Sequence, residues 1–298
     1  MMQAIYLLCG ISRQGHIQAI KRQAAQVEQS TIYIRLMEQV RAIHPGMGLR
    51  TMYDMLEPEG IGRDAFIVLG LQEGFRLKAI ENKTRTTCSI KTNRYKNLLC
   101  DKEFTDINQL WSSDITYWYI LEKFYYLIFI MDVYSRRIIG YSVADNMKAE
   151  NNYKALKMAL TLRGINDYQY KLIHHSDKGS QYVSELYTET LHDYHINISM
   201  CNEVYENTHI ERVNDTIKNQ YLNRMQISNY QQIEQIVKQV ITTYNEKRPH
   251  QSLHKKTPCQ YEAYLLNTNQ KNRQKMKIFT SDLSQKMAQN KQLKLFNN

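Results

Sequence analysis

The pattern of apolar and polar positions divides the chain into a helical N-terminal part and a longer part that mixes strands with helices. In residues 1–75 the apolar residues recur at helical spacing, which predicts helices within 5–22, at 31–43, at 49–56 and at 63–75. Ser12 is suited to cap the first helix, and the segments 44–46 and 58–62 carry the Pro and Gly residues that end helices. Consecutive short helices of this size are compatible with a helix-turn-helix-like DNA-reading module and equally with a packing domain.

The middle of the chain changes to the period of strands. Runs at 110–119, 125–133 and 138–144 follow one another closely, and the second is almost continuously apolar, as in a buried central strand. A helix at 149–163 that ends at Gly164, a strand at 170–176, a helix at 183–192, a short strand at 196–201 and a helix at 230–244 come next. Three connected strands followed by alternating helices and strands predict an α/β fold with a mixed sheet flanked by helices.

The net positive charge of the chain favours a polyanionic partner. The 298 residues are enough for about two domains, and Lys plus Arg exceed Asp plus Glu by 39 − 29 = 10, which gives a pI of about 9.2. The basic, polar stretch 76–104 is predicted to be a linker, which either follows a phosphate backbone or serves as a solvated spacer. The predicted organisation is a helical region at 1–75, this linker, a core at 105–265 and a basic, flexible tail at 266–298.

Several classes of protein are disfavoured by what the chain lacks. The start of the sequence does not look like a signal peptide, and no run reaches the roughly 18 apolar residues of a membrane span, so a cytoplasmic protein without a membrane partner is expected. The five cysteines are scattered, without the spacing of a zinc site or the density of a disulfide scaffold. We interpret them as reduced thiols.

Three acidic residues are the candidates for chemistry. Asp114 lies within an aromatic and β-branched strand, Asp177 follows a short strand and precedes a glycine-containing turn, and Glu211 lies on a helix opposite an apolar face. Carboxylates on rigid elements are the ligands that Mg²⁺ (or Mn²⁺) prefers, and two such ions activate a hydroxyl and stabilise the leaving oxygen of a phosphodiester. A glycoside hydrolase would use only two of these acids and would leave the basic segments without a role.

Four motifs stand in order along the chain. They are Trp111-x-x-Asp114-Ile115-Thr116-Tyr117, the run from Tyr125 to Arg136, His175-Ser176-Asp177-x-Gly179-Ser180-Gln181-Tyr182, and the sequence from Tyr244 to Leu253. Together they resemble bacterial insertion-sequence transposases, of the superfamily that includes retroviral integrases. The resemblance covers residues 105–262 closely and the N-terminal part loosely. It implies a ribonuclease-H-like core with an Asp-Asp-Glu triad of Asp114, Asp177 and Glu211 as catalytic and metal-binding residues.

The third acid departs slightly from the pattern of that group. Between Asp177 and Glu211 lie 211 − 177 − 1 = 33 residues, fewer than is usual there, and Glu203 and Glu206 are nearby rivals. Asn207 stands one helical turn before Glu211, as the pattern of the group asks, which favours Glu211. In the same terms Asp132 matches a non-catalytic position.

The neighbours of the triad receive roles from the same reasoning. His174 and His175 are interpreted as one packing residue and one that orients Asp177 or a phosphate, in preference to metal ligands. Lys178, Arg212, Lys218 and Arg248 are the predicted DNA contacts, and the sequence leaves open whether Arg248 and His250 stabilise the core or touch DNA.

The activity implied is metal-dependent cleavage of DNA at the ends of a mobile element, followed by attack of the freed 3′ hydroxyl on a second phosphodiester. Joining two ends implies a homo-oligomer, and related elements often supply an upstream-frame protein with a helix-turn-helix and a zipper as partner. The alternatives are a catalytically idle DNA-binding protein, a partial transposase that needs that partner, and a plain nuclease of the same fold.

Overall fold

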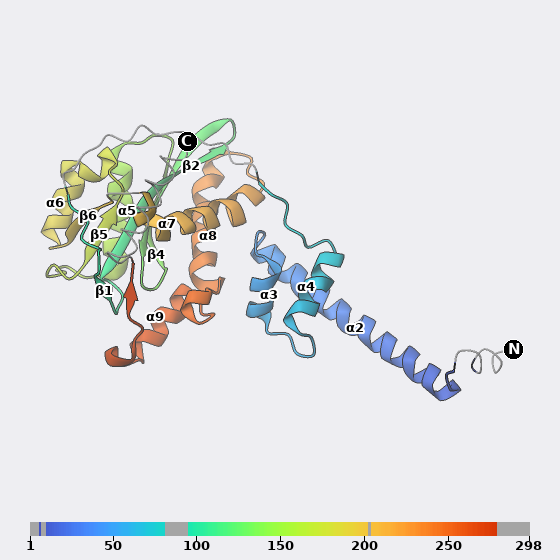
Figure 1. Cartoon of the computed structure of the whole chain (residues 1–298). Coiled ribbons are helices and arrows are strands. Elements are labelled where there is room, and N and C mark those ends of the chain that lie inside the picture. Colours follow the sequence, from blue (N-terminus) through green and yellow to red (C-terminus); the bar gives the residue numbers. More distant parts are fainter. Residues whose placement is uncertain (1–5, 7–9, 81–94, 202–203, 279–298) are drawn as a thin grey trace, which may run out of the picture. The chain divides into compact units, whose positions relative to one another are not determined.

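The computed structural model describes residues 6, 10–80, 95–201 and 204–278. The chain divides into two compact units, Met1–Ala79 and Ile80–Asn298 (Figure 1). None of the helices within the described ranges is long and apolar enough to cross a membrane.

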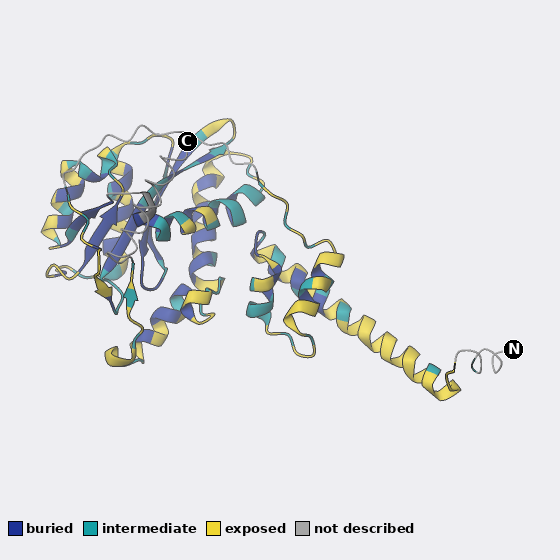
Figure 2. Ribbon diagram, viewed as in Figure 1, coloured by how far each residue is buried: buried dark blue, intermediate teal, exposed yellow. Residues whose placement is uncertain are grey.

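The N-terminal unit consists of three helices, α2 (Arg13–Ile43), α3 (Leu49–Leu56) and α4 (Arg63–Gln72). Ser12 caps α2 as predicted, with its hydroxyl accepting from the Gly15 N–H over 2.9 Å. The two helices expected within 5–43 form one helix of 31 residues, because nothing between residues 22 and 31 breaks it. Only its last turns pack, through Tyr33, Met37 and Val40, and its first half is exposed (Figure 2).

The larger unit is built on a five-stranded mixed sheet with the strand order β4-β3-β2-β5-β6. The antiparallel part is β2 (Leu110–Ile120), β3 (Lys123–Asp132) and β4 (Ile138–Ala144), the predicted meander. β5 (Ile173–Ser176) pairs parallel with β2, and β6 (Asn197–Met200) pairs parallel with β5. The mixed α/β fold expected from the sequence is therefore present.

Helices cover both faces of this sheet. On one face α5 (Ala149–Arg163) and α6 (Glu185–Asp193) pack on the odd-numbered residues of β2 and the even-numbered residues of β3, such as Trp111 and Ile130. On the other face lie α7 (Thr208–Asp215), the π-helical turn η3 (Thr216–Tyr221) and α8 (Tyr230–Lys247), over residues such as Leu110 and Phe129. Because side chains of a strand alternate between faces, β3 is buried on both sides along most of its length.

Gly140 permits the close approach of α5 to the sheet. A Cβ at this position would lie 2.2 Å from the backbone oxygen of Ala155, so no larger residue fits between β4 and α5. At the other end of α5, Gly164 takes a left-handed backbone with φ 63° and ends the helix where the sequence predicted.

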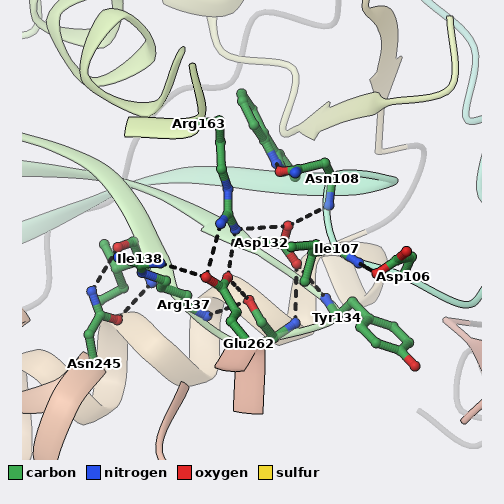
Figure 3. Close-up of polar contacts among 12 residues, drawn as sticks. Asp106, Ile107, Asn108, Asp132, Tyr134, Arg137, Ile138, Arg163, Asn245 and Glu262 are labelled. Atoms are coloured by element: carbon green, nitrogen blue, oxygen red, sulfur yellow. Dashed lines mark hydrogen bonds and ion pairs between the residues drawn. The ribbon is translucent and has the colours of Figure 1, made fainter. Parts of the chain in front are cut away.

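A buried ionic network joins the β3–β4 turn to the C-terminal helix α9 (Pro258–Leu266) (Figure 3). Arg163 donates to Asp132 over 3.2 Å and to Glu262 over 2.7 Å, and all three side chains are at most 10% exposed. Asp132 also accepts from the backbone N–H groups of Asn108, Tyr134 and Ser135. The Asp132 carboxylate therefore forms hydrogen bonds and an ion pair within the fold, as expected of a non-catalytic position.

Parts of the predicted linker and tail belong to the folded core. Strand β1 (Glu103–Phe104) pairs with β7 (Met276–Lys277), and Arg273 forms an ion pair with Asp106. Leu99 and Phe104 are buried, so the apolar residues of this stretch outweigh its basic composition. The expectation of a flexible tail from residue 266 is therefore wrong for the segment up to Ile278, while residues 81–94 and 279–298 lie outside the described residues.

Candidate active site

Asp114 and Asp177 stand at equivalent positions of two neighbouring strands. In the parallel pairing of β2 with β5, Ser113 lies beside Ser176. Asp114 is the next residue of β2, and Asp177 is the residue that directly follows β5. Asp114 is separated from Leu110 and from Trp118 by an even number of positions, so the three side chains lie on the same face of β2. Leu110 and Trp118 pack toward α7 and α8, and Asp114 therefore faces that side of the sheet. The sheet thus brings together two carboxylates that are 63 positions apart in the sequence, since 177 − 114 = 63.

The turn after β5 is shaped around Asp177. The Gly179 N–H donates to Oδ1 of Asp177 over 3.0 Å, and a Cβ at residue 179 would lie only 3.0 Å from that same oxygen. Tyr182, further along the turn, shares a 2.9 Å hydrogen bond with the hydroxyl of Ser113 on β2. The glycine and the tyrosine of this motif therefore hold the turn against the strand that carries Asp114.

One face of α7 and η3 runs along β2. The Asn207 amide oxygen accepts from Ser112 Oγ over 2.5 Å, and its amide nitrogen donates to the carbonyl of Ser113 over 3.2 Å. Two turns later Asn214 donates to Asp114 Oδ2 over 2.7 Å, and Lys218 donates to Thr116 Oγ1 over 3.2 Å. Glu211 lies one turn after Asn207 and one turn before Asn214, so it faces the same strand beside Asp114.

The charges of the three acids act on one another. The pKa of Asp114 is raised well above its ordinary value, first because its carboxylate is withdrawn from water and then because Asp177 and Glu211 add negative charge nearby. Partial burial also raises the pKa of Asp177 and of Glu211, against the Gly179 N–H in the first case. The three predicted catalytic carboxylates are thus gathered by β2, β5 and α7.

Of the two rivals for the third acid, only Glu206 lies within the described residues. Glu206 is buried, and its charge raises the pKa of Cys201 together with the charges of the triad, after the larger effect of burial. The two acids whose charge acts most on Asp114 are Asp177 and Glu211. Glu203 lies outside the described residues.

The two histidines before Asp177 both pair with neighbouring side chains. His174 Nε2 pairs with the Tyr187 hydroxyl at 2.9 Å, and His175 pairs with Ser199 Oγ at 2.9 Å and Cys201 Sγ at 3.1 Å. Both ring nitrogens of His175 therefore have partners other than Asp177, and none of the hydrogen bonds recorded among the described residues joins His174 to Asp177. The expectation that one of them orients Asp177 is thus not met by a direct hydrogen bond, and the expectation that one orients a phosphate stays a prediction.

The predicted DNA-binding residues fall into two groups. Lys218 lies in the site, where burial lowers its pKa against the charges of Asp215 and Asp114, and Lys178 adjoins Asp177. Arg212 is exposed on a different face of α7 from Glu211, and Arg248 follows α8. The structure therefore brings Lys218 to the carboxylates, with Lys178 next to Asp177 in the sequence, whereas Arg212 lies on another face of α7 and Arg248 is half-buried after α8.

The donor set suits a divalent cation. In the described part of the chain, none of the three carboxylates pairs with Lys or Arg in a salt bridge, and the charge of Asp114 acts on Lys218 without a direct ion pair. Three carboxylates, with no His or Cys among them, are a donor set that fits Mg²⁺ or Mn²⁺ by chemistry. Among the described residues, no three His, Cys, Asp or Glu side chains are placed so that they could hold a metal ion together as they stand.

The sequence reasoning missed Asn214 and Thr116. Both are uncharged residues whose part in the site depends on the contact between α7, η3 and β2. The available signal was spacing, because Asn207, Glu211, Asn214 and Lys218 recur every three or four residues on one helical face.

Comparisons with known proteins identify the family of the chain. Two descriptions of the integrase core domain match residues 105–204 and 194–258. An uncharacterized 31 kDa protein of insertion element IS600 from Shigella sonnei is 30% identical over 266 residues, which span 85% of this chain and 95% of that protein. The transposase for insertion sequence element IS629 from Shigella sonnei is 30% identical over 225 residues, or 74% of each chain.

Solved structures include a similar catalytic domain. The HTLV-2 integrase catalytic core domain in complex with magnesium is 20% identical and aligns with 56% of this chain and 99% of its own, with a TM-score of 0.42.

Proposed function

Because the chain belongs to the insertion-sequence transposases with an integrase core domain, we propose that Asp114, Asp177 and Glu211 form its catalytic and metal-binding triad. Its activity is that of a transposase, an enzyme of DNA transposition. The single observation that carries the assignment is the shared face of α7 and β2, on which Glu211 lies between two asparagines bonded to the strand of Asp114. Mg²⁺, with Mn²⁺ as a substitute, is the cofactor that these oxygen donors suit.

Two such ions supply activation of the attacking hydroxyl and stabilisation of the leaving oxygen of a phosphodiester. The three carboxylates would hold them where β5 ends beside the middle of β2. Asn214 fixes the orientation of Asp114, and Asn207 fixes α7 against β2. The protein's own contribution is positioning and charge, without a covalent enzyme intermediate.

In this proposal the four predicted DNA-binding residues contact two different parts of the DNA. Lys218 lies closest to the carboxylates and would meet the phosphate that reacts, with Lys178 beside Asp177. Arg212 and Arg248 would contact the duplex away from the reacting bond. A homo-oligomer, and a helix-turn-helix and zipper protein from an upstream frame, are the partners we propose for bringing two ends together.

The test is a strand-transfer assay on the full chain with a labelled duplex of the element's end. Wild type and Asp177→Asn are incubated with Mg²⁺ or Mn²⁺, and cleaved and joined products are separated on a gel. We expect joined products from the wild type and none from the variant, with DNA binding retained by both. Equal product from Asp177→Asn would refute the triad, and cleavage without joining would indicate a plain nuclease.

A further inference from the structure

A cavity of about 170 Å³ opens on the face of α7 that points away from the triad. Its walls come from α7, from the β3–β4 turn and from α8 with the segment that follows it. Arg212 and Ser252 are exposed, so the cavity is open to solvent. The described lining residues are Arg136, His209, Arg212, Val213, Thr216, Tyr244, His250 and Ser252. We call this cavity the α7–α8 pocket.

The charge in the α7–α8 pocket is one-sided. Arg136 and Arg212 both line it, and none of the described lining residues is acidic. Burial lowers the pKa of Arg136 and the nearby charge of Arg212 lowers it further, while the charge of Asp132 raises it. The hydrogen bond of Arg136 that the structure records is a 4.0 Å contact with Sδ of Met276, a weak acceptor. Neither guanidinium group forms a salt bridge with an acid among the described residues.

Neighbouring donors are buried and unsatisfied. Nε2 of His250 and Nη1 of Arg248 have no hydrogen-bond partner among the described residues although neither atom is open to solvent. Leaving a buried polar atom unpaired costs about 1–3 kcal/mol, which a protein tolerates where a ligand completes the bond. The hydroxyls of Thr216 and Ser252 add two further donors at the same walls.

We propose that the α7–α8 pocket binds a backbone phosphate of DNA, at a site separate from the reacting phosphodiester. A planar guanidinium presents paired N–H donors that match phosphate oxygens, and two of them with hydroxyl and imidazole donors form a complete anion site. A metal cation would be repelled there. A carboxylate of a second copy shares the chemistry, but DNA is the substrate class of a transposase, and Arg212 adjoins Glu211 on α7.

This inference rests on the proposed function only for the identity of DNA as the ligand. A phosphate held beside the helix that carries Glu211 would fix the duplex relative to the triad. Because a phosphate contact involves no base, it would strengthen binding to every DNA sequence equally.

The experiment measures binding of the full chain to two duplexes, one with the element's end and one of unrelated sequence, over a series of salt concentrations in EDTA. Arg136→Gln and Arg212→Gln are compared with Lys154→Gln, an exposed lysine on α5. Each arginine variant is expected to bind both duplexes more weakly and to make the slope of log K against log salt shallower, by at most about 0.9 because the two arginines share one phosphate. Lys154→Gln is expected to leave the slope unchanged.

Unchanged affinity and slope in both arginine variants would overturn the proposal. A change in molar mass without a change in slope would also overturn it, in favour of a carboxylate from a second copy. Should Arg136→Gln not fold, the exposed Arg212 carries the test alone. Because binding is measured without metal, a chain that binds as expected but does not join DNA contradicts the proposed activity of this chain by itself and leaves the pocket standing.

Discussion

The side-chain amide of Asn214 donates to Oδ2 of Asp114 over 2.7 Å and so joins α7 to β2. A ligand oxygen that is held by a neighbouring donor has a fixed orientation, and such supporting contacts affect metal affinity and rate almost as strongly as the ligands do. The amide also stabilises the ionised form of Asp114, whose pKa is otherwise raised by burial and by two nearby acids.

Replacing Asn214 with Ala should therefore slow strand transfer by roughly 10–100-fold and raise the Mg²⁺ concentration needed for half-maximal rate. The measurement is the rate of joining over a Mg²⁺ titration. The matched control is Asn267→Ala, an exposed asparagine at the end of α9. If the two variants respond alike to Mg²⁺, Asn214 has no positioning role.

Lys218 is the cation of the site, because its Nζ reaches Thr116 on the strand of Asp114. Lys218→Ala should lower the cleavage rate roughly 10–100-fold, since a preorganised charge near the reacting phosphate is lost. Lys238→Ala, on the exposed side of α8, supplies the comparison. Rates measured at saturating DNA separate this effect from weaker binding, and a normal rate under those conditions would contradict the assignment.

The network of Arg163, Asp132 and Glu262 should matter for stability. Arg163→Met would leave two buried carboxylates without their partner and is expected to lower the free energy of unfolding by about 3–5 kcal/mol. Lys275→Ala removes an exposed partner of Glu103, whose pairing is worth at most about 1 kcal/mol. Urea unfolding of both variants measures the difference, and similar losses would show that the buried network is not specially stabilising.

Buried histidines should make the larger unit sensitive to acid. Burial lowers the pKa of His174 and of His250 from 6.5 to about 3. The unfolded chain therefore binds more protons below pH 6.5, so this stability is complete above that pH and declines as pH falls toward 3. At pH 5.5 the loss is about 1 kcal/mol per histidine.

The test compares urea midpoints at pH 7.5 and pH 5.5 for the wild type, His174→Gln and the exposed-residue control His192→Gln. We expect His174→Gln to lose less stability between these pH values than the other two proteins. An equal loss in all three would mean that His174 does not carry the effect.

The sequence predicted the bounds of helices and strands best where particular residues mark their ends. The bounds of α3, β4 and α5 match the predictions because glycines, a tight turn or a change of period mark each end. The sequence did not predict the extent of α2, because no residue marks where its packed C-terminal turns meet its exposed first half. The triad could be proposed from motifs, but the contact of Asn214 could not, because the role of an asparagine within a helix depends on the strand that it faces. The α7–α8 pocket could not be foreseen either, since Arg136 and His250 come from distant segments.

The central claim is that α7 completes the site with Glu211. The most direct measurement is strand transfer by Glu211→Gln and Glu206→Gln side by side, with a labelled end duplex and Mn²⁺, after both variants have been shown to fold and to bind that duplex. We predict that Glu211→Gln yields no joined product whereas Glu206→Gln retains joining. Joining by Glu211→Gln at the wild-type rate, or loss of joining only in Glu206→Gln, would contradict the account.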